Sequence, residues 1–252
     1  MSLFTVTMLA ASLSYSTPQG AIAGYGEAIA RNDPALLAAA FQPSAIMYCT
    51  DGSDLRATYQ AQWKQRMQTS GPPTGPVSTR LDWVDEGTTT ALARATAVRG
   101  DKRFVDYLLL ARLKGGWRIV GKLCQADASP TPDSVAAISA VVDTKLAADR
   151  SWDPVVLAES IDPRALVMTV EDGEFVAATL AEWQARYVDR RKASPGNAIT
   201  ITSRVIDARG QIGVARWSFR ARDGAEWTDR ALMIRTPQGW RMTALIFVRE
   251  VP

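Results

Sequence analysis

The chain has 252 residues, of which 47% are hydrophobic and 22% charged, with a net charge of +3 and no histidine. This length fits one large or two small domains, and the composition excludes disordered and collagen-like proteins. The small charge gives no reason to expect nucleic acid as a partner, and no apolar run reaches the roughly 18 residues needed to cross a membrane. Without histidine, Ser/His/Asp and Cys/His triads are excluded, and we expect neither a metal nor a cofactor.

The first residues are ambiguous. Residues 3–13 are apolar, but no Lys or Arg precedes them and Thr and Ser interrupt them. We therefore expect a cytoplasmic protein, with export as the alternative if residues 1–20 are a signal segment.

The first half of the chain predicts helices followed by strands. Thr17-Pro18 begins a helix that Asn32-Asp33-Pro34 ends, and a short helix follows over 35–41. A short strand is expected at 45–49, and the pattern around Trp63 indicates a third helix. Four longer strands are then expected at 78–85, 89–98, 103–113 and 117–125. This order is typical of the α+β class, with helices packed on an antiparallel sheet.

The second half repeats the first. Asp33-Pro34, Trp63 and Arg66 recur 120 residues later, and Arg94 recurs as Arg216. The shift then settles at 123 for Asp106/Asp229, Arg112/Arg235, Trp117/Trp240 and Arg118/Arg241. A period this long makes each copy a whole domain. We expect domains at 16–125 and 134–250, joined by a proline-containing linker at 126–133.

The pattern Tyr25-x7-Asp33-Pro34-x6-Phe41-x-Pro43, together with Phe104-Val-Asp-Tyr-x9-Trp117-Arg-Ile-Val, resembles the nuclear transport factor 2-like superfamily. Within it, the chain looks most like the lumazine-binding-like and polyketide-cyclase-like branches. The resemblance covers each repeat almost completely. It implies two tandem cone-shaped domains, each with three helices packed on a curved antiparallel sheet around a central pocket. It also implies that the two domains pair through their sheets as an intramolecular pseudo-dimer.

The resemblance also offers a catalytic template, that of the ketosteroid isomerases, which use an aspartate base and an oxyanion hole of tyrosine and protonated aspartic acid. Tyr25 and Asp106 match the oxyanion-hole positions, but Cys49 stands where the base would be. In the second copy, Lys145 and Thr169 replace the tyrosine and the base, and Asp229 remains. A working isomerase site is therefore not expected in either half.

Several candidate residues have two interpretations. Asp106 either lines a pocket or forms a cross-strand ion pair with Arg94, as Asp229 would with Arg216. Cys49 and Cys124 are either two buried thiols or one bridge. The recurring tryptophans are interpreted as core residues. The pocket predicted for the first repeat is lined by Tyr25, Cys49, Asp106, Phe104 and Trp63, and its counterpart in the second by Lys145, Thr169, Asp229 and Trp183.

Three functions are compatible with these patterns. The preferred one is a small-molecule-binding protein with a mostly apolar pocket in the first repeat and no complete catalytic set. The second is an isomerase, cyclase or dehydratase for an apolar cyclic substrate, with Asp106 or Cys49 transferring the proton. The third is a protein-interaction module that uses its sheet faces.

Overall fold

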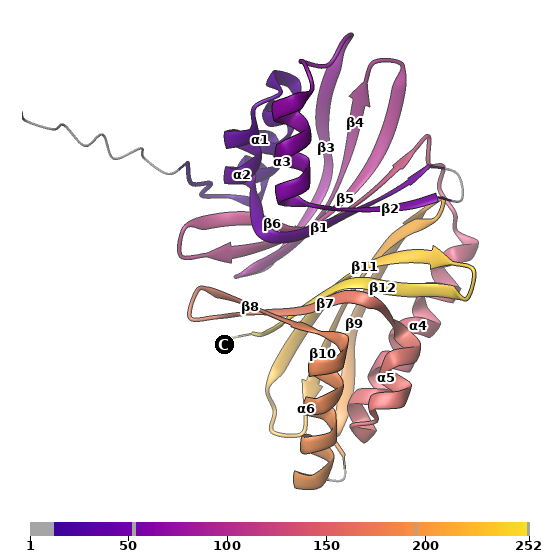
Figure 1. Cartoon of the computed structure of the whole chain (residues 1–252). Coiled ribbons are helices and arrows are strands. Elements are labelled where there is room, and N and C mark those ends of the chain that lie inside the picture. The colour runs from indigo at the N-terminus through magenta and orange to yellow at the C-terminus, as the bar shows by residue number, and fades with distance from the viewer. Residues whose placement is uncertain (1–12, 52–53, 195, 251–252) are drawn as a thin grey trace, which may run out of the picture.

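The computed structural model describes residues 13–51, 54–194 and 196–250 and shows two six-stranded sheets, each with three helices on one face (Figure 1). The expected α+β class with two tandem domains is confirmed. The candidate signal segment falls mainly on residues 1–12, which lie outside the described ranges. None of the helices in those ranges combines the length and apolarity required to span a membrane.

The two domains, called repeat 1 and repeat 2 below, have the same order of elements. Repeat 1 contains α1 (Pro18–Arg31), α2 (Pro34–Ala40), β1 (Phe41–Asp51), β2 (Asp54–Tyr59), α3 (Gln60–Thr69), β3 (Val77–Glu86), β4 (Thr90–Arg99), β5 (Lys102–Leu113) and β6 (Gly116–Ala126). Repeat 2 contains α4 (Asp133–Ser151), α5 (Pro154–Ser160), β7 (Ile161–Glu171), β8 (Glu174–Thr179), α6 (Leu180–Ala193), β9 (Ile199–Arg209), β10 (Ile212–Ala221), β11 (Glu226–Thr236) and β12 (Gly239–Arg249).

Local sequence signals explain where the first helices begin and end. The Thr17 side chain accepts a hydrogen bond from the Gly20 N–H, and Asn32 ends α1 in the left-handed conformation. Asp33 then caps α2 by accepting from two backbone N–H groups, with a proline at the first helical position. Asp153 caps α5 in the same way. The duplicated Asp-Pro pair is thus a duplicated helix start.

The sheets are more complete than the sequence indicated. Their strand orders are β2-β1-β6-β5-β4-β3 and β8-β7-β12-β11-β10-β9. The edge strands β2 and β8 were not expected from the sequence pattern. The β1–β6 and β7–β12 pairs are parallel. The expectation of a purely antiparallel sheet is therefore wrong for both repeats. These parallel pairs arise because α3, or α6, carries the chain from one edge of the sheet to the other. The four strands that follow then return toward the first strand and end beside it.

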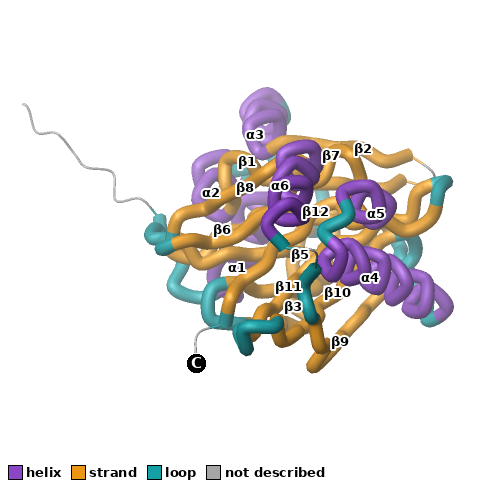
Figure 2. The backbone as a smooth tube through the Cα atoms, turned by 90° about the horizontal axis from the view of Figure 1, so that it is seen from below, coloured by secondary structure: helices purple, strands orange, loops and turns teal. Residues whose placement is uncertain are grey.

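The two sheets pack face to face, with the helices on the outer sides (Figures 1 and 2). Each repeat has its own core between helices and sheet. A third apolar cluster joins the sheets, with Ile46, Tyr48, Leu92, Tyr107 and Leu109 on one side and Met168, Ile212, Val214, Leu232 and Ile246 on the other. The pairing of the two repeats through their sheets is therefore intramolecular. Gly121 lies at a point of close approach, since a Cβ atom there would meet Leu232 Cδ1 at 3.1 Å.

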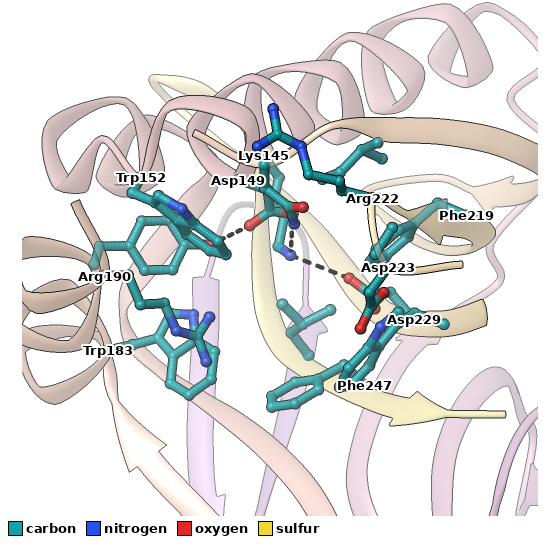
Figure 3. A pocket seen from close by; sticks show the side chains of 16 residues that line it. Lys145, Asp149, Trp152, Trp183, Arg190, Phe219, Arg222, Asp223, Asp229 and Phe247 are labelled. Carbon is teal, nitrogen blue, oxygen red and sulfur yellow. Dashed lines mark hydrogen bonds and ion pairs between the residues drawn. The ribbon is translucent and has the colours of Figure 1, made fainter. Parts of the chain in front are cut away.

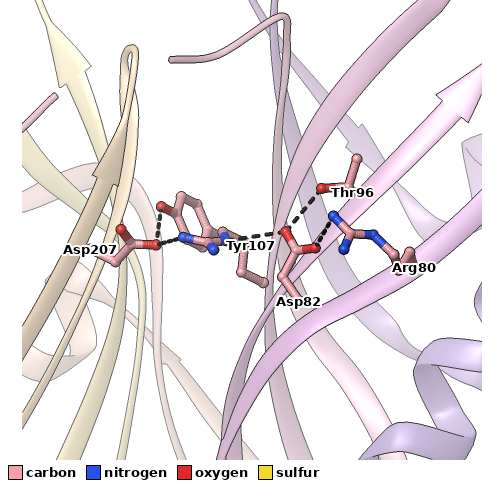
Figure 4. A network of polar contacts seen from close by, with 6 residues as sticks. Arg80, Asp82, Thr96, Tyr107 and Asp207 are labelled. Carbon is pink, nitrogen blue, oxygen red and sulfur yellow. Dashed lines mark hydrogen bonds and ion pairs between the residues drawn. The ribbon is translucent and has the colours of Figure 1, made fainter. Parts of the chain in front are cut away.

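Reciprocal ion pairs cross this interface. Arg94 Nη1 lies 2.7 Å from Asp207 Oδ2 (Figure 4), and the matching Arg216 Nε lies 3.0 Å from Asp85 Oδ2. The expected cross-strand pairs of Arg94 with Asp106 and of Arg216 with Asp229 are wrong. Arg94 is opposite Tyr107 in the β4–β5 ladder, which places its side chain on the face away from Asp106. The duplicated arginines bind the two repeats to each other.

Candidate functional site

In repeat 1, the predicted polar residues meet inside the core. Asp106 on β5 accepts hydrogen bonds from Tyr25 Oη on α1 at 2.8 Å and from Lys122 Nζ on β6 at 2.7 Å. Arg99 donates to the same tyrosine oxygen at 2.6 Å. Asp106, Tyr25 and Lys122 are all at most 1% exposed. Burial raises the pKa of Tyr25 well above its usual value, and burial together with Arg99 lowers the pKa of Lys122 to about 8 despite the attraction of Asp106.

Aromatic rings fill the space next to this cluster. Tyr25, Phe41 and Trp63 pack edge to face with centroids 5.5–5.8 Å apart. The Arg99 guanidinium lies over Trp63 and Phe104, at 6.0 and 5.6 Å. Four of the residues predicted for repeat 1, Tyr25, Asp106, Phe104 and Trp63, are therefore linked by contacts through Tyr25 and Arg99.

Cys49 forms a disulfide with Cys124, its neighbour in the β1–β6 ladder. Of the two interpretations left open for these cysteines, the structure shows the bridge. Cys124 in turn is opposite Asp106 in the β5–β6 ladder. A bridged sulfur has no proton to transfer, so a catalytic role for Cys49 would require prior reduction.

In repeat 2, Asp229 corresponds to Asp106, but its lysine partner comes from a helix and not from the neighbouring strand. Lys145 on α4 lies 3.1 Å from Asp229 on β11 and 2.6 Å from Asp149, one helical turn away. Tyr187 on α6 donates a short hydrogen bond to Asp149. Burial raises the pKa of Asp229 to about 6, although Lys145 opposes the shift. Burial disfavours the ammonium of Lys145, but the two carboxylates outweigh it and raise its pKa.

This second cluster borders a cavity of about 570 Å³ (Figure 3). Six of its 16 lining residues are aromatic, namely Trp152, Trp183, Tyr187, Phe219, Trp227 and Phe247. Arg190 on α6 stacks on Trp152 and Trp183, with its guanidinium carbon 4.9 and 5.3 Å from the ring centroids. This cavity thus borders residues predicted for the pocket of repeat 2, and it lies where two rings of repeat 1 are missing: Lys145 occupies the position of Tyr25, and Ile161 that of Phe41.

Two polar atoms in the cavity wall are buried without a hydrogen-bond partner in the described part of the chain. They are Asp229 Oδ1, an acceptor, and Trp183 Nε1, a donor that is near enough to the Tyr187 hydroxyl to lower its pKa but does not meet the geometry of a hydrogen bond to it. Both residues are at most 5% exposed. Leaving such groups unsatisfied costs about 1–3 kcal/mol each, which makes them candidates for contact with a ligand.

The predicted residues of repeat 2 divide in two groups. Lys145, Asp229 and Trp183 line the cavity, whereas Thr169 is buried and is not one of the lining residues. Sequence reasoning missed Asp149, Tyr187 and Arg190. The available signals were the spacings of Asp149 four residues after Lys145, and of Tyr187 and Arg190 after Trp183, which put each set on one helix face. In the part of the chain that the structure describes, no cluster of Cys, Asp and Glu is suited to hold a metal ion.

The profile of one protein family, described as "Putative lumazine-binding", matches residues 17–125 and again residues 133–248. None of the curated proteins matches the chain.

Solved structures resemble single repeats. An NTF-2-like protein of unknown function from Silicibacter pomeroyi is 18% identical, with a TM-score of 0.40, over 43% of this chain and 91% of its own. A putative dehydratase from Streptomyces avermitilis is 15% identical, with a TM-score of 0.41, over 48% of this chain and 100% of its own. A putative ketosteroid isomerase from Shewanella frigidimarina is 19% identical, with a TM-score of 0.38, over 44% and 94%.

Proposed function

We propose that this chain, which belongs in both repeats to the family described as putative lumazine-binding proteins, binds a flat heteroaromatic molecule in the cavity of repeat 2. The family match agrees with the lumazine-binding-like branch named by the sequence resemblance. The family name and the aromatic wall both favour a planar ring, since indole and phenyl faces stack on such ligands at little entropic cost.

The observation that carries this proposal is the pair of unpartnered atoms in the wall. A ligand with one N–H and one carbonyl or ring nitrogen can donate to Asp229 Oδ1 and accept from Trp183 Nε1. Each contact would remove the cost of a buried polar group without a partner. A pure hydrocarbon ring would satisfy neither atom.

Charge in the cavity floor also selects the ligand. Lys145 is shared between Asp149 and Asp229, so the three groups carry a net negative charge when both carboxylates are ionised. The remaining acceptor is a carboxylate oxygen, which attracts an N–H and repels an anion at this point. The proposed ligand is therefore neutral or cationic along the edge that faces Asp229.

Binding of lumazine, measured by its own fluorescence and by quenching of tryptophan emission, tests the proposal. Trp183→Phe keeps a large aromatic ring and removes the N–H, so its dissociation constant should rise roughly threefold to tenfold. Trp63→Phe, the same change at the matching position of repeat 1, should leave the constant unchanged. Equal effects of the two substitutions, or no saturable binding by the wild-type protein, would refute the proposed site.

Binding should also depend on pH through Asp229. Its pKa of about 6 means that the carboxyl is protonated below that value and ionised above it. A ligand N–H that donates to the carboxylate should therefore bind more tightly as the pH rises from 5 to 7. Titrations across this range check the sign, and Asp229→Asn, which cannot ionise, should flatten the profile. A profile that persists in this variant would assign the titration to another group.

A proton-transfer reaction is the second candidate, because a buried carboxylate with a pKa near 6 has the properties of a general base. This moves the catalytic alternative from Asp106 and Cys49 to Asp229. Recovery of a bound ligand in altered form, lost with Asp229→Asn, would favour it over simple binding. The protein-interaction alternative required free sheet faces. The faces that the helices leave uncovered pack against each other, which disfavours this alternative.

The disulfide leads us to propose an oxidising compartment, the export alternative, as the place of action. The bridge between Cys49 and Cys124 favours it over the cytoplasm that the sequence suggested. Alkylation of the protein in intact cells before any reductant is added should label neither thiol. Labelling of both cysteines would support the cytoplasm instead.

A further inference from the structure

A second cavity, of about 540 Å³, lies where the two repeats meet the linker. Strands β3, β4 and β5 of repeat 1 form one wall, linker residues 127–130 form another, and Arg209 at the end of β9 closes the third. The linker is held in place because Pro130 forms an isolated bridge with Arg209 and the Gly210 N–H donates to the Ser129 carbonyl. The walls of this cleft therefore come from both repeats and are fixed relative to each other.

Four arginines and two aspartates line the cleft. Two of the arginines have carboxylate partners: Arg80 lies 2.9 Å from Asp82, and Arg94 is held between Asp82 at 3.2 Å and Asp207 at 2.7 Å (Figure 4). These contacts form a neutral framework. The other two arginines of the cleft are Arg103 and Arg209.

Arg103 and Arg209 have no carboxylate within ion-pair distance in the ranges that the structure describes. Arg209 Nε is moreover buried without a hydrogen-bond partner there. The lining aspartate that remains, Asp127, balances one of these two charges. The cleft thus has an excess of positive charge and an unused guanidinium donor.

We propose that this cleft binds the phosphate group of a small molecule, held by Arg103 and Arg209. Guanidinium groups donate two parallel N–H bonds to tetrahedral oxyanions, and the Ser129 hydroxyl in the wall is a further donor. The volume admits a ligand larger than the free ion. The site is separate from the cavity of repeat 2 and does not depend on the function proposed there.

The duplication shows that sheet packing does not require these two arginines. Glu226 matches Arg103 at the shift of 123, and Gly87 matches Arg209 at the shift of 122 that also relates Asp85 to Asp207. The structural framework, in contrast, is duplicated, since Arg94–Asp207 and Arg216–Asp85 are both present. The pair Arg103 and Arg209 is thus a feature of one side of the pseudo-symmetric interface only.

Calorimetric titration of the whole protein with inorganic phosphate and with glycerol 3-phosphate tests this inference. We expect one saturable site for at least one of the two probes. Arg209→Gln should weaken binding by about tenfold or more, because it removes a charged hydrogen-bond donor. Arg103→Gln changes an exposed side chain and should do the same without affecting the fold. Arg220→Gln, which removes an exposed arginine paired with Glu226, is the matched control and should change the affinity less than twofold.

Tighter binding of glycerol 3-phosphate than of phosphate would identify an organic phosphate as the ligand, and equal affinities would identify the free ion; both support the site. The inference is overturned if neither probe saturates, or if Arg220→Gln weakens binding as much as the two cleft variants. Circular dichroism of each variant separates loss of the site from loss of the fold. Lumazine binding is measured in the same samples, so failure here is distinguishable from failure of the function proposed for repeat 2.

Discussion

Replacing Lys122 by methionine is expected to lower the free energy of unfolding by about 3–5 kcal/mol. The substitution preserves the volume of the side chain but removes the ammonium that lies 2.7 Å from Asp106 Oδ1. Asp106 is fully buried, so its carboxylate would keep only the Tyr25 hydroxyl as a side-chain partner. An ion left in the core without its counter-ion is costly because it has lost its hydration shell.

Urea unfolding of single and double variants checks the cause of this loss. The double variant Asp106→Asn/Lys122→Met removes both charges and should recover most of the stability, because no buried charge is then left without a partner. A double variant as unstable as Lys122→Met alone would show that lost packing, not charge, is responsible.

The sequence predicted the parts of the fold that local signals determine. The side chains of Thr17, Asp33 and Asp153 cap the starts of α1, α2 and α5, and the repeated Asp-Pro pair marks the duplication in the sequence itself. The alternation of hydrophobic and polar residues predicted the longer strands equally well. The edge strand β2 was missed because Asp51-Gly52 was interpreted as the end of a strand, whereas Asp51 pairs with Asp54 and β2 runs back along β1.

The face of each strand could not be predicted, because it depends on the length of a turn. The β4–β5 hairpin pairs Arg99 with Lys102, so only two residues form its loop. A loop of three residues would have put Arg94 and Asp106 on the same face, whereas a loop of two puts them on opposite faces. This single residue decides whether Arg94 faces the core of repeat 1 or crosses to Asp207.

The sequence also could not predict which repeat contains the cavity. Both repeats have an aspartate on the same strand and a tryptophan on the same helix, so their patterns are nearly equivalent. The difference comes from volume. Tyr25 and Phe41 fill the interior of repeat 1, whereas Lys145 and Ile161 leave room beside Trp183 in repeat 2. Such differences depend on how three elements meet, which no periodicity within one element records.

Removing the disulfide between Cys49 and Cys124 should lower the free energy of unfolding about as much as replacing Lys122 by methionine. The bridge joins residues separated by 75 positions in sequence, and closing a loop of that length restricts the unfolded chain by about 4 kcal/mol. The variant Cys49→Ala/Cys124→Ala should therefore lose about this much stability and melt roughly 10 °C lower in a chain of this size.

The reduced wild-type protein separates the bond from the side chains. Reduction breaks the cross-link but keeps both sulfur atoms in the β1–β6 ladder, so the reduced protein should lose stability nearly as the double-alanine variant does. Repeat 2 shows that the ladder itself does not need the bridge, because Thr169 and Phe247 stand at the matching positions and β7 and β12 still pair. The loss should consequently appear in thermodynamics and leave the circular dichroism of the folded state unchanged. A reduced protein as stable as the oxidised one would contradict this account, because the cross-link would then add nothing to the packing of β1 on β6.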